Sequence, residues 1–279
     1  PKFRSSIGKL PVLHAIIKYN RTQMLDFLIN YAKPNILNQL AAALDGQDRN
    51  VIQYLWDVAK SVDTLIYETL FNCGILNTTD LFILMCVNNF NGSVDSIKAK
   101  YEINVDEHVN ANGIAPFKIF PLYAACRGQH ESVVRMLVEK KADVTMEIRN
   151  GQTALWMSSW MSNANIVQIL LHEMKQTLTD EQMIEMVNCS TITDSTPLRN
   201  AVKMGNSQVV SLLLDAKADV HKADMNGNTV LHIAAAGNDG KSVALLIKNG
   251  ASTDVKNKNG DSPVFIALRK NAIKSLQAF

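Results

Sequence analysis

The chain has 279 residues, of which 28 are Lys or Arg and 26 are Asp or Glu, so its formal net charge is only +2. This balance, with no block of like charges, excludes a polybasic factor that binds nucleic acid through charge alone. Hydrophobic residues make up 47% of the sequence, and the 7 Pro and 13 Gly are too few for a collagen-like or low-complexity chain.

Residues 1–119 contain three pairs of apolar segments, each typical of two short helices joined by a turn. In chain order, the pairs are Leu13–Ile17 with Met24–Ile29, Leu40–Leu44 with Val51–Trp56, and Phe82–Val87 with Val94–Ile97. The spacing drifts, because the step from Leu13 to Leu40 is much shorter than the next two, to Phe82 and to Leu122. The sequence therefore predicts degenerate helical repeats here, with a separate helical domain over residues 1–105 as the alternative.

A regular period of about 33 residues, a typical length for a helical repeat, runs through residues 120–279. The first segment of each unit recurs at this step, namely Phe120–Ala125, Thr153–Ser158, Thr196–Ala201, Thr229–Ala234 and Ser262–Ala267. A second apolar segment follows the first in several of these units, as in Val133–Leu137, Val209–Leu214 and Val243–Leu246. Only the step from Thr153 to Thr196 is longer than the others, which indicates an insertion between them.

These units resemble the ankyrin repeat, whose signature combines T-P-L-H-x-A, a V-V-x-L-L-L helix and a G-A-D closing turn. Residues 227–254 match it best, through Gly227, Thr229, Leu231-His232, Ala234-Ala235 and Gly250-Ala251. The resemblance implies an all-α fold, an ankyrin-repeat solenoid of stacked helix-turn-helix units with β-hairpin-like fingers. Stacking is needed because one such unit is too small to bury its own apolar face.

The predicted organisation has two parts. Residues 1–119 form degenerate ankyrin-like helical repeats, and residues 120–279 form five ankyrin repeats with the insertion at residues 178–187. Eight units of this length would take up nearly the whole chain, which favours one continuous array over two domains. A second insertion, at His108–Phe120, lengthens one finger. Insertions in repeat arrays tend to lie on one face, often the binding face, and the alternative is that each is a solvated loop without a role in binding.

Several residues predict where the helices begin and end. The Thr that opens most of the units is suited to cap the first helix, and Pro197 and Pro263 fit the first helical position. Gly250 suits the left-handed conformation that ends a helix. Thr179 and Gln182 have the spacing of a capping box, which predicts a short amphipathic element at Leu178–Val187.

The sequence contains no catalytic or metal-binding motif. Phosphate-binding loops, the H-E-x-x-H zinc motif and the G-x-S-x-G nucleophile motif are all absent, so we predict that the chain is not an enzyme and needs no cofactor and no metal. For His14 and His232 the resemblance implies structural hydrogen bonds to neighbouring turns. Free thiols in a reducing compartment are expected for the four cysteines, which lack metal-ligand spacing: Cys73, Cys86, Cys126 and Cys189.

Targeting signals are also missing from the sequence. The opening residues do not form a signal peptide, and the longest apolar stretches, such as Leu81–Val87, are far shorter than the ~20 residues of a membrane span. We therefore expect an intracellular protein, in the cytoplasm or the nucleus. Since the chain begins Pro-Lys-Phe without an initiator Met, we also expect it to be a piece of a longer protein.

The resemblance also implies where a partner would bind. In ankyrin repeats the exposed, variable positions flank the finger turn and follow the Ala pair of the first helix. Transferred to this sequence, these positions give ten candidate partner-binding residues: Arg127, Arg149, Asn150, Gln152, Trp160, Met161, Lys203, Met204, Met225 and Asn226. Further exposed positions by the same criterion are Ile119, Ser195, Asn228, Lys258, Asn259, Asp261, Arg269 and Lys270.

Trp160 and Met161 stand out among these candidates, with Met204 one repeat further on. Aromatic residues and Met are enriched in the cores of protein interfaces, so these three side chains indicate a binding surface. The alternative is that the stretch Met157–Met161 simply packs against a neighbouring finger.

The predicted function is a protein-protein interaction module, an adaptor or scaffold that holds a partner protein or peptide on its concave face, with no nucleic-acid partner. Arg269 and Lys270, with Lys256 and Lys258 nearby, indicate either a preference for an acidic partner or a solvated end face. The alternative function is a regulatory or targeting ankyrin segment of a larger enzyme or channel. Such a segment would contact the catalytic or transport domain of its own parent chain.

Overall fold

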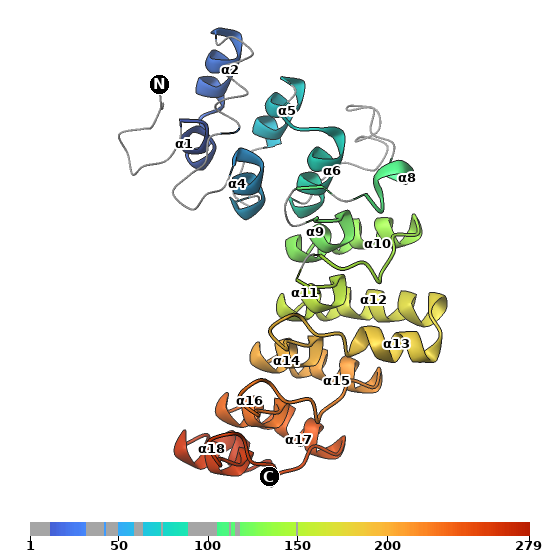
Figure 1. The fold of residues 1–279 in the computed structure, drawn as a ribbon, viewed down its shortest axis with the longest axis vertical. Helices are drawn as coiled ribbons and strands as arrows, with labels where there is room; N and C mark the ends of the chain where they lie inside the picture. The colour runs from blue at the N-terminus through green and yellow to red at the C-terminus, as the bar shows by residue number, and fades with distance from the viewer. Residues whose placement is uncertain are drawn as a thin grey trace. The chain divides into compact units, whose positions relative to one another are not determined.

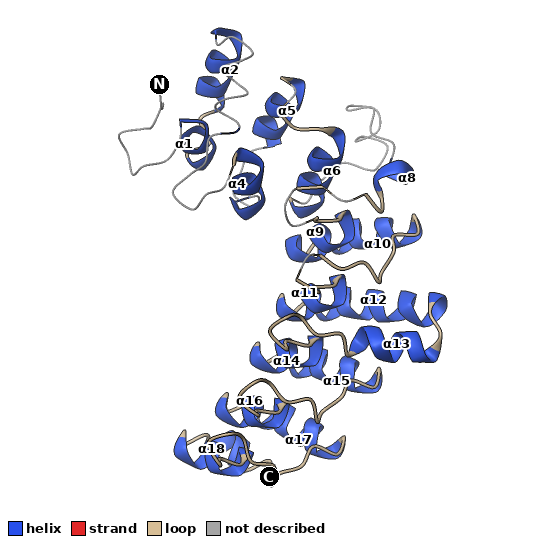
Figure 2. Cartoon of the chain, in the orientation of Figure 1, coloured by secondary structure: helices blue, strands red, loops and turns tan. Residues whose placement is uncertain are grey.

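The computed structural model describes residues 12–31, 42, 50–58, 64–73, 75–88, 105–111, 113–114, 118–148 and 150–279. The described residues form helices joined by loops (Figure 2), with two isolated antiparallel bridges, Gly113–Ile119 and Glu147–Thr153. The chain divides into two compact units, Pro1–Ala142 and Asp143–Phe279. This division falls within the segment predicted to hold the five repeats. The predicted boundary between residues 119 and 120 rests on repeat similarity and stays a prediction.

The first unit consists of short helices, labelled in Figure 1. In chain order they are α1 (Val12–Lys18), α2 (Thr22–Tyr31), α4 (Val51–Val58), α5 (Thr64–Asn72), α6 (Thr78–Val87), α8 (Val105–His108), α9 (Pro121–Gly128) and α10 (Glu131–Glu139). Four of the six predicted segments lie in α1, α2, α4 and α6. Of Leu40–Leu44 only Ala42 is described, and Val94–Ile97 lies outside the described residues.

Helix α6 forms the centre of the first unit, because every residue from Asp80 to Val87 is buried and the helix packs on α4, α5 and α9. The Asp80 carboxylate accepts hydrogen bonds from the backbone N–H of Ile114 (2.6 Å) and from the side-chain amide of Asn77 (2.9 Å). Its burial raises the pKa of Asp80. The bond from Ile114 ties the finger that contains Gly113 and Ile119 to the start of α6, and the bond from Asn77, the N-cap residue, lies within that helix start.

The second unit is a stack of helix pairs, seen in the lower part of Figure 1. Helices α11 (Ala154–Trp160), α14 (Pro197–Lys203), α16 (Val230–Ala236) and α18 (Pro263–Arg269) follow one another in what we call the first row. The second row contains α12 (Ala164–Thr177), α15 (Ser207–Asp215), α17 (Gly240–Lys248) and α19 (Ile273–Leu276), with α13 (Asp180–Val187) beside α12.

The predicted helix starts are confirmed in the first row. The hydroxyl oxygens of Thr153, Thr196 and Ser262 accept hydrogen bonds from the N–H three residues later, at 3.1, 3.2 and 3.3 Å. Pro197 and Pro263 take the first helical position, where the missing N–H has no intrahelical partner to lose. Each first-row helix therefore begins at a fixed residue of its repeat.

The insertion lengthens the second row. Helix α12 has 14 residues, against 9 in α15 and in α17, and α13 follows it. The predicted capping box is present, because Gln182 N–H donates to Thr179 Oγ1 (3.3 Å) and Thr179 N–H donates to Gln182 Oε1 (3.0 Å). After α13, the Asn188 side chain donates to the carbonyl of Lys217 (3.1 Å) and accepts from the N–H of Asp219 (2.7 Å). These bonds join the end of the insertion to the next repeat.

Each of four fingers in the second unit closes on a hydrogen bond between an N–H and the carbonyl four residues later. The pairs are Ile148–Gln152 (3.0 Å), Thr191–Ser195 (3.1 Å), Asp224–Asn228 (3.0 Å) and Asn257–Asp261 (3.0 Å). Neighbouring fingers also bond to each other, since Lys258 N–H donates to the carbonyl of Asn226 (3.0 Å). The fingers therefore stack in register with the helices.

Buried polar side chains join successive repeats. His232 Nδ1 accepts from the N–H of Thr229 (3.1 Å), which leaves its Nε2–H to donate to the carbonyl of Asp261 in the next finger (3.2 Å). This is the inter-turn role that the resemblance implies for His232. Gly250, at the end of α17, has a φ of 89°, the left-handed conformation that we predicted.

Arg199 occupies the equivalent position one repeat earlier, where it is also buried. Its guanidinium pairs with the Asp224 carboxylate (3.1 Å) and donates to the carbonyls of Lys222 (3.2 Å) and Asn228 (3.1 Å). The longer side chain thus makes three contacts to the next finger where His232 makes one.

Gly227 is constrained by the neighbouring finger as well as by its backbone. Its φ is 76°, and an added Cβ would lie 3.1 Å from the backbone nitrogen of Lys258. Gly250, with a φ of 89°, has open space around the same position.

We expect Gly250→Ala to lower the free energy of unfolding by about 1 kcal/mol through backbone strain alone, and Gly227→Ala by about 2–3 kcal/mol. Urea unfolding of both variants measures the difference, and equal losses would contradict the finger contact.

Replacing Arg199 tests the tie between repeats. Arg199→Ala leaves Asp224 and two finger carbonyls without this donor, and we expect a loss of about 2–4 kcal/mol in the free energy of unfolding. Arg199→His should recover part of that loss, because an imidazole at this position bonds to the next finger in the His232 repeat. A histidine variant no more stable than the alanine variant in urea unfolding would show that the two positions are not equivalent.

Stability of the second unit should also depend on pH. Burial lowers the pKa of His232 below its usual 6.5. As the pH falls through 6.5, His232 takes up a proton in the unfolded chain but stays neutral in the folded chain. The free energy of unfolding is therefore highest above this pH and decreases below it. The slope is at most about 1.4 kcal/mol per pH unit for one proton. We expect His232→Gln to remove this component in urea unfolding followed by tryptophan fluorescence. His221→Gln, at an exposed position, is the control and should keep it.

Candidate functional site

The first-row helices end at four equivalent positions. The C-cap residue of each has a right-handed helical backbone, and its N–H bonds to the carbonyl four residues earlier. We call these C-caps, together with the residue before each of them, the helix-end row. In chain order the row consists of Trp160-Met161, Lys203-Met204, Ala236-Gly237 and Arg269-Lys270.

An aromatic stack fixes the beginning of the helix-end row. The rings of Trp156 and Trp160 are stacked, with centroids 6.0 Å apart and planes 2° from parallel. Lys203 Nζ lies 5.1 Å from the centroid of the Trp160 ring, in cation–π geometry. Trp156 is the ring that reaches the neighbouring finger, where its Nε1–H donates to the carbonyl of Ser195 (3.1 Å). Trp160 remains half-buried at the surface.

Four of the predicted residues therefore come together: Trp160, Met161, Lys203 and Met204. Met204 is 41% exposed, Lys203 is exposed, and Met161 is half-buried. The neighbouring pair Ala236-Gly237 carries no long side chain. The first half of the row thus presents apolar area and one ammonium group from two adjacent repeats.

The predicted finger residues lie apart from the helix ends in sequence. Met225, 64% exposed, and Asn226 sit at the tip of the finger closed by Asp224 and Asn228. Asn150 is exposed at the tip of an earlier finger, which the carbonyl of Gln152 closes. Arg149 lies outside the described residues.

Two of the further positions that we expected to be exposed are buried instead. Ile119 is 1% exposed, because it is drawn into the bridge that its N–H and carbonyl form with Gly113. Asp261 is 6% exposed, because its carbonyl closes a finger and also accepts the Nε2–H of His232. Both residues therefore build the array and do not face a partner.

Arg127 lies in the first unit, and its side chain is used inside that unit. The guanidinium stacks over the ring of Trp56, 4.3 Å from its centroid, and donates to the carbonyl of the same residue. Burial lowers the pKa of Arg127. The contact joins α9 to α4, so this side chain contributes to packing within the first unit.

Several exposed apolar side chains were not among the predicted residues. Ile192 is 77% exposed at a finger tip, and Phe265 and Leu268 are exposed on α18. Phe265 stands three residues after Ser262, at the position that His232 occupies in the repeat before. The sequence could have indicated Phe265 as an exposed apolar residue, because it has a phenylalanine where the preceding repeat has the buried polar residue His232.

The described residues do not offer catalytic or metal-binding chemistry. No group of three His, Cys, Asp or Glu side chains among them could hold a metal ion. All four cysteines are free, and burial raises the pKa of each thiol, so the reactive thiolate is disfavoured at neutral pH. A search of the described residues for a helix long and apolar enough to cross a membrane finds none.

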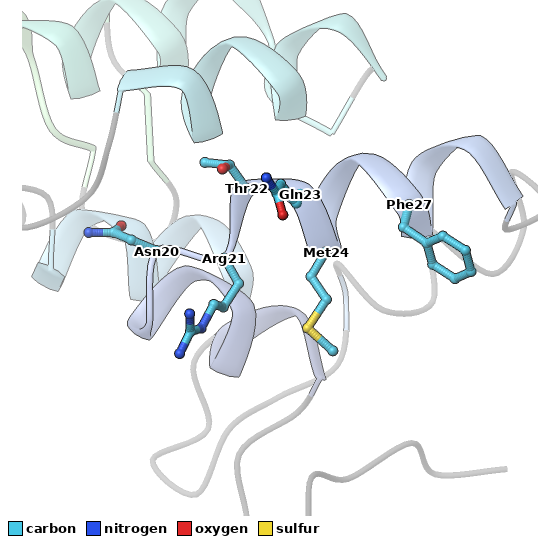
Figure 3. Close-up of a pocket in the computed structure, with 6 residues that line it drawn as sticks. All are labelled: Asn20, Arg21, Thr22, Gln23, Met24 and Phe27. Atoms are coloured by element: carbon cyan, nitrogen blue, oxygen red, sulfur yellow. The ribbon is translucent and has the colours of Figure 1, made fainter.

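The first unit has an open hollow of about 560 Å³ at the turn between α1 and α2 (Figure 3). Its lining contains one cation, three uncharged polar side chains and two apolar side chains: Asn20, Arg21, Thr22, Gln23, Met24 and Phe27. Among these described lining residues there is no carboxylate, thiol or imidazole, so they do not supply an acid–base pair.

These features define a class of protein. Short antiparallel helix pairs, capped at fixed positions and tied to the next pair by buried polar groups, form a helical repeat protein whose variable residues lie at helix ends and fingers. A family model described as ankyrin repeats (3 copies) matches residues 82–182, 178–257 and 198–279, which together exceed half of the chain. The chain belongs to the ankyrin-repeat family. The predicted all-α ankyrin solenoid is thereby confirmed, and the family is a non-catalytic fold for protein-protein interaction.

Known relatives match about half of the chain. The sequence is 30% identical over 146 residues to "Neurogenic locus notch homolog protein 1" of Xenopus laevis and 29% identical over 146 residues to the Homo sapiens protein of that name. It is 31% identical over 148 residues to the "Nuclear factor NF-kappa-B p105 subunit" of Gallus gallus. Each match covers 52% of this chain, but only 5% of the two notch proteins and 15% of the p105 subunit.

Proposed function

We propose that the second unit holds a partner protein or peptide on its concave face, formed by the helix-end row and the fingers, and so acts as an adaptor or scaffold. The observation that carries this proposal is the cluster of Trp160, Met161 and Met204 beside Lys203. Aromatic and Met side chains are enriched at interface cores, and Trp is enriched among the residues that dominate binding energy.

Preorganisation supports the same proposal. Trp160 is held between the Trp156 ring and the Lys203 ammonium, and both helices that carry these residues begin at capped, fixed positions. Ordering a flexible side chain at an interface costs about 0.5–1.5 kcal/mol. A side chain that is already ordered avoids most of that cost. Recognition then needs a rigid surface and no chemistry on the ligand.

The partner proposed here includes the rest of a parent chain. The matches with the notch and p105 proteins cover small fractions of those proteins, so related arrays occur within much longer chains. An intracellular location, in the cytoplasm or the nucleus, belongs to the same proposal. The words "Nuclear factor" in the name of one relative support it.

A double variant tests the binding surface. We expect Trp160→Ala/Met161→Ala to lose at least about 2 kcal/mol of binding energy, or ~30-fold in affinity, because a Trp anchor is removed. The measurement is an affinity pull-down from cell lysate with quantitative mass spectrometry, after circular dichroism has confirmed folding.

Ile184→Ala is the matched control, since it removes an exposed apolar side chain from α13. A partner lost from the double variant and kept by the control supports the proposed surface. If the double variant retains every partner of the wild type, the interface does not lie at Trp160. A wild type that captures no partner would instead favour binding to its own parent chain.

A further inference from the structure

The helix-end row changes its chemistry from one end to the other. Its α11 position carries Trp160 and Met161, its α14 position carries Lys203 and Met204, and its α16 position has only small side chains. Its α18 position carries Arg269 and Lys270, both exposed. Lys203 lies over the Trp160 ring, so the α11 and α14 end combines large apolar side chains with one engaged cation, whereas both side chains at the α18 end are basic. Because the four positions are structurally equivalent, this is a gradient from mainly apolar to basic along one face of the second unit.

Acidic residues are absent from the first-row helices. Helices α11, α14, α16 and α18 contain no Asp or Glu. The second row and α13 carry acidic residues together with lysines. The acidic ones are Glu173, Asp180, Glu181, Glu185 and Asp215, and the lysines are Lys175, Lys241, Lys248 and Lys274. The positive charge of the first row is therefore not compensated within its own helices.

The cations at the basic end are available to a ligand. Within the described part of the chain, no ion pair engages the exposed Lys258 or Lys270. Arg269 pairs with Asp261 at 2.8 Å, which orients its guanidinium but leaves the side chain 53% exposed. The Asp261 side chain is only 9% exposed, so the surface presented to solvent is cationic.

Exposed carboxylates in the fingers lie toward the other end. Glu147 and Asp194 are exposed in the fingers that precede α11 and α14. Asp219 and Asp254, also exposed, lie in the closing turns that follow α15 and α17 in the second row. An acidic ligand would therefore be repelled near α11 and attracted near α18, which sets its orientation.

Distance along the row limits the shape of the ligand. Packed helices lie about 8–10 Å apart, so three steps from α11 to α18 span about 24–30 Å. An extended chain rises about 3.3 Å per residue, so roughly seven to nine residues would cover the row.

We propose that the helix-end row, together with the finger that contains Lys258 and is paired to Arg269 through Asp261, binds an extended acidic segment of a partner protein, with an apolar anchor at Trp160 and Met204 and carboxylates at Lys258, Arg269 and Lys270. This inference rests on the proposed function and adds the chemistry and direction of the partner. Complementary charge of this kind accelerates association and selects partners, and it is weakened by salt.

The probe is a phage-displayed library of random peptides of about 12 residues, longer than the row requires. Selection on the full chain should enrich peptides that combine Asp and Glu with an aromatic or aliphatic residue. Enriched peptides without an excess of Asp and Glu would overturn the inference. A library that yields no peptide above background would also overturn it.

Charge reversal then tests the basic end with a selected peptide. We expect Lys258→Glu/Lys270→Glu to weaken binding at least ~10-fold at about 50 mM salt, and much less at high salt. The control, Lys241→Glu/Lys248→Glu, makes the same change in charge on exposed residues of α17 and should stay within about 2-fold of wild type. Equal losses from both variants would show only a response to net charge and overturn the inference.

Two further results separate this inference from the proposed function. Binding of the selected peptide could be lost in Trp160→Ala/Met161→Ala but unchanged in Lys258→Glu/Lys270→Glu. This result would leave the proposed function standing and refute the acidic partner. A peptide unaffected by the tryptophan variant would refute the proposed surface itself. Single-stranded DNA that matches the peptide's affinity and depends on the same lysines would assign the basic end to nucleic acid, which also overturns the inference.

Discussion

Buried polar groups between successive repeats hold the second unit in register. Arg199 donates to the finger that follows it, and His232 does the same one repeat later. A buried donor or acceptor without a partner costs about 1–3 kcal/mol, so each of these side chains favours one placement of the next repeat. Apolar burial alone, which is non-directional, would not choose between neighbouring placements. The positions of fingers, helix ends and surface side chains all follow from this registration.

Because the repeats stack in a fixed register, the residues that pack between repeats are distinct from the residues whose identity can vary. Inward-facing positions such as Leu198, Leu231 and Ala234 are fully used by packing. Most side chains at helix ends and finger tips are exposed or half-buried, so their chemistry can differ from repeat to repeat without altering the buried stack. The gradient from Trp160 to Lys270 lies entirely in such positions. Fold and binding chemistry are thus specified by different residues of the same repeat.

Local and periodic features were predictable from the sequence. The repeat period, the caps at Thr153 and Thr196 and the capping box at Thr179 can be read along the chain. Contacts between distant residues were not predictable, as the stacking of Arg127 on Trp56 shows. The position of Lys203 over Trp160 likewise depends on the distance between two helices, which no sequence spacing encodes. For this reason the sequence suggested candidate binding residues but not which of them lie in contact.

The insertion between α11 and α14 adds chain without changing the step of the first row. Asn206, the cap of α15, donates to the carbonyl of Ser162 (2.8 Å) across the inserted residues, and Asn188 returns the chain to the following repeat. The inserted residues therefore extend the second row sideways and do not lengthen the stack of repeats. A repeat array can therefore gain or lose a helix on one flank while the helix-end row keeps its geometry. The same position offers protein engineers a place to graft a tag or a second recognition element.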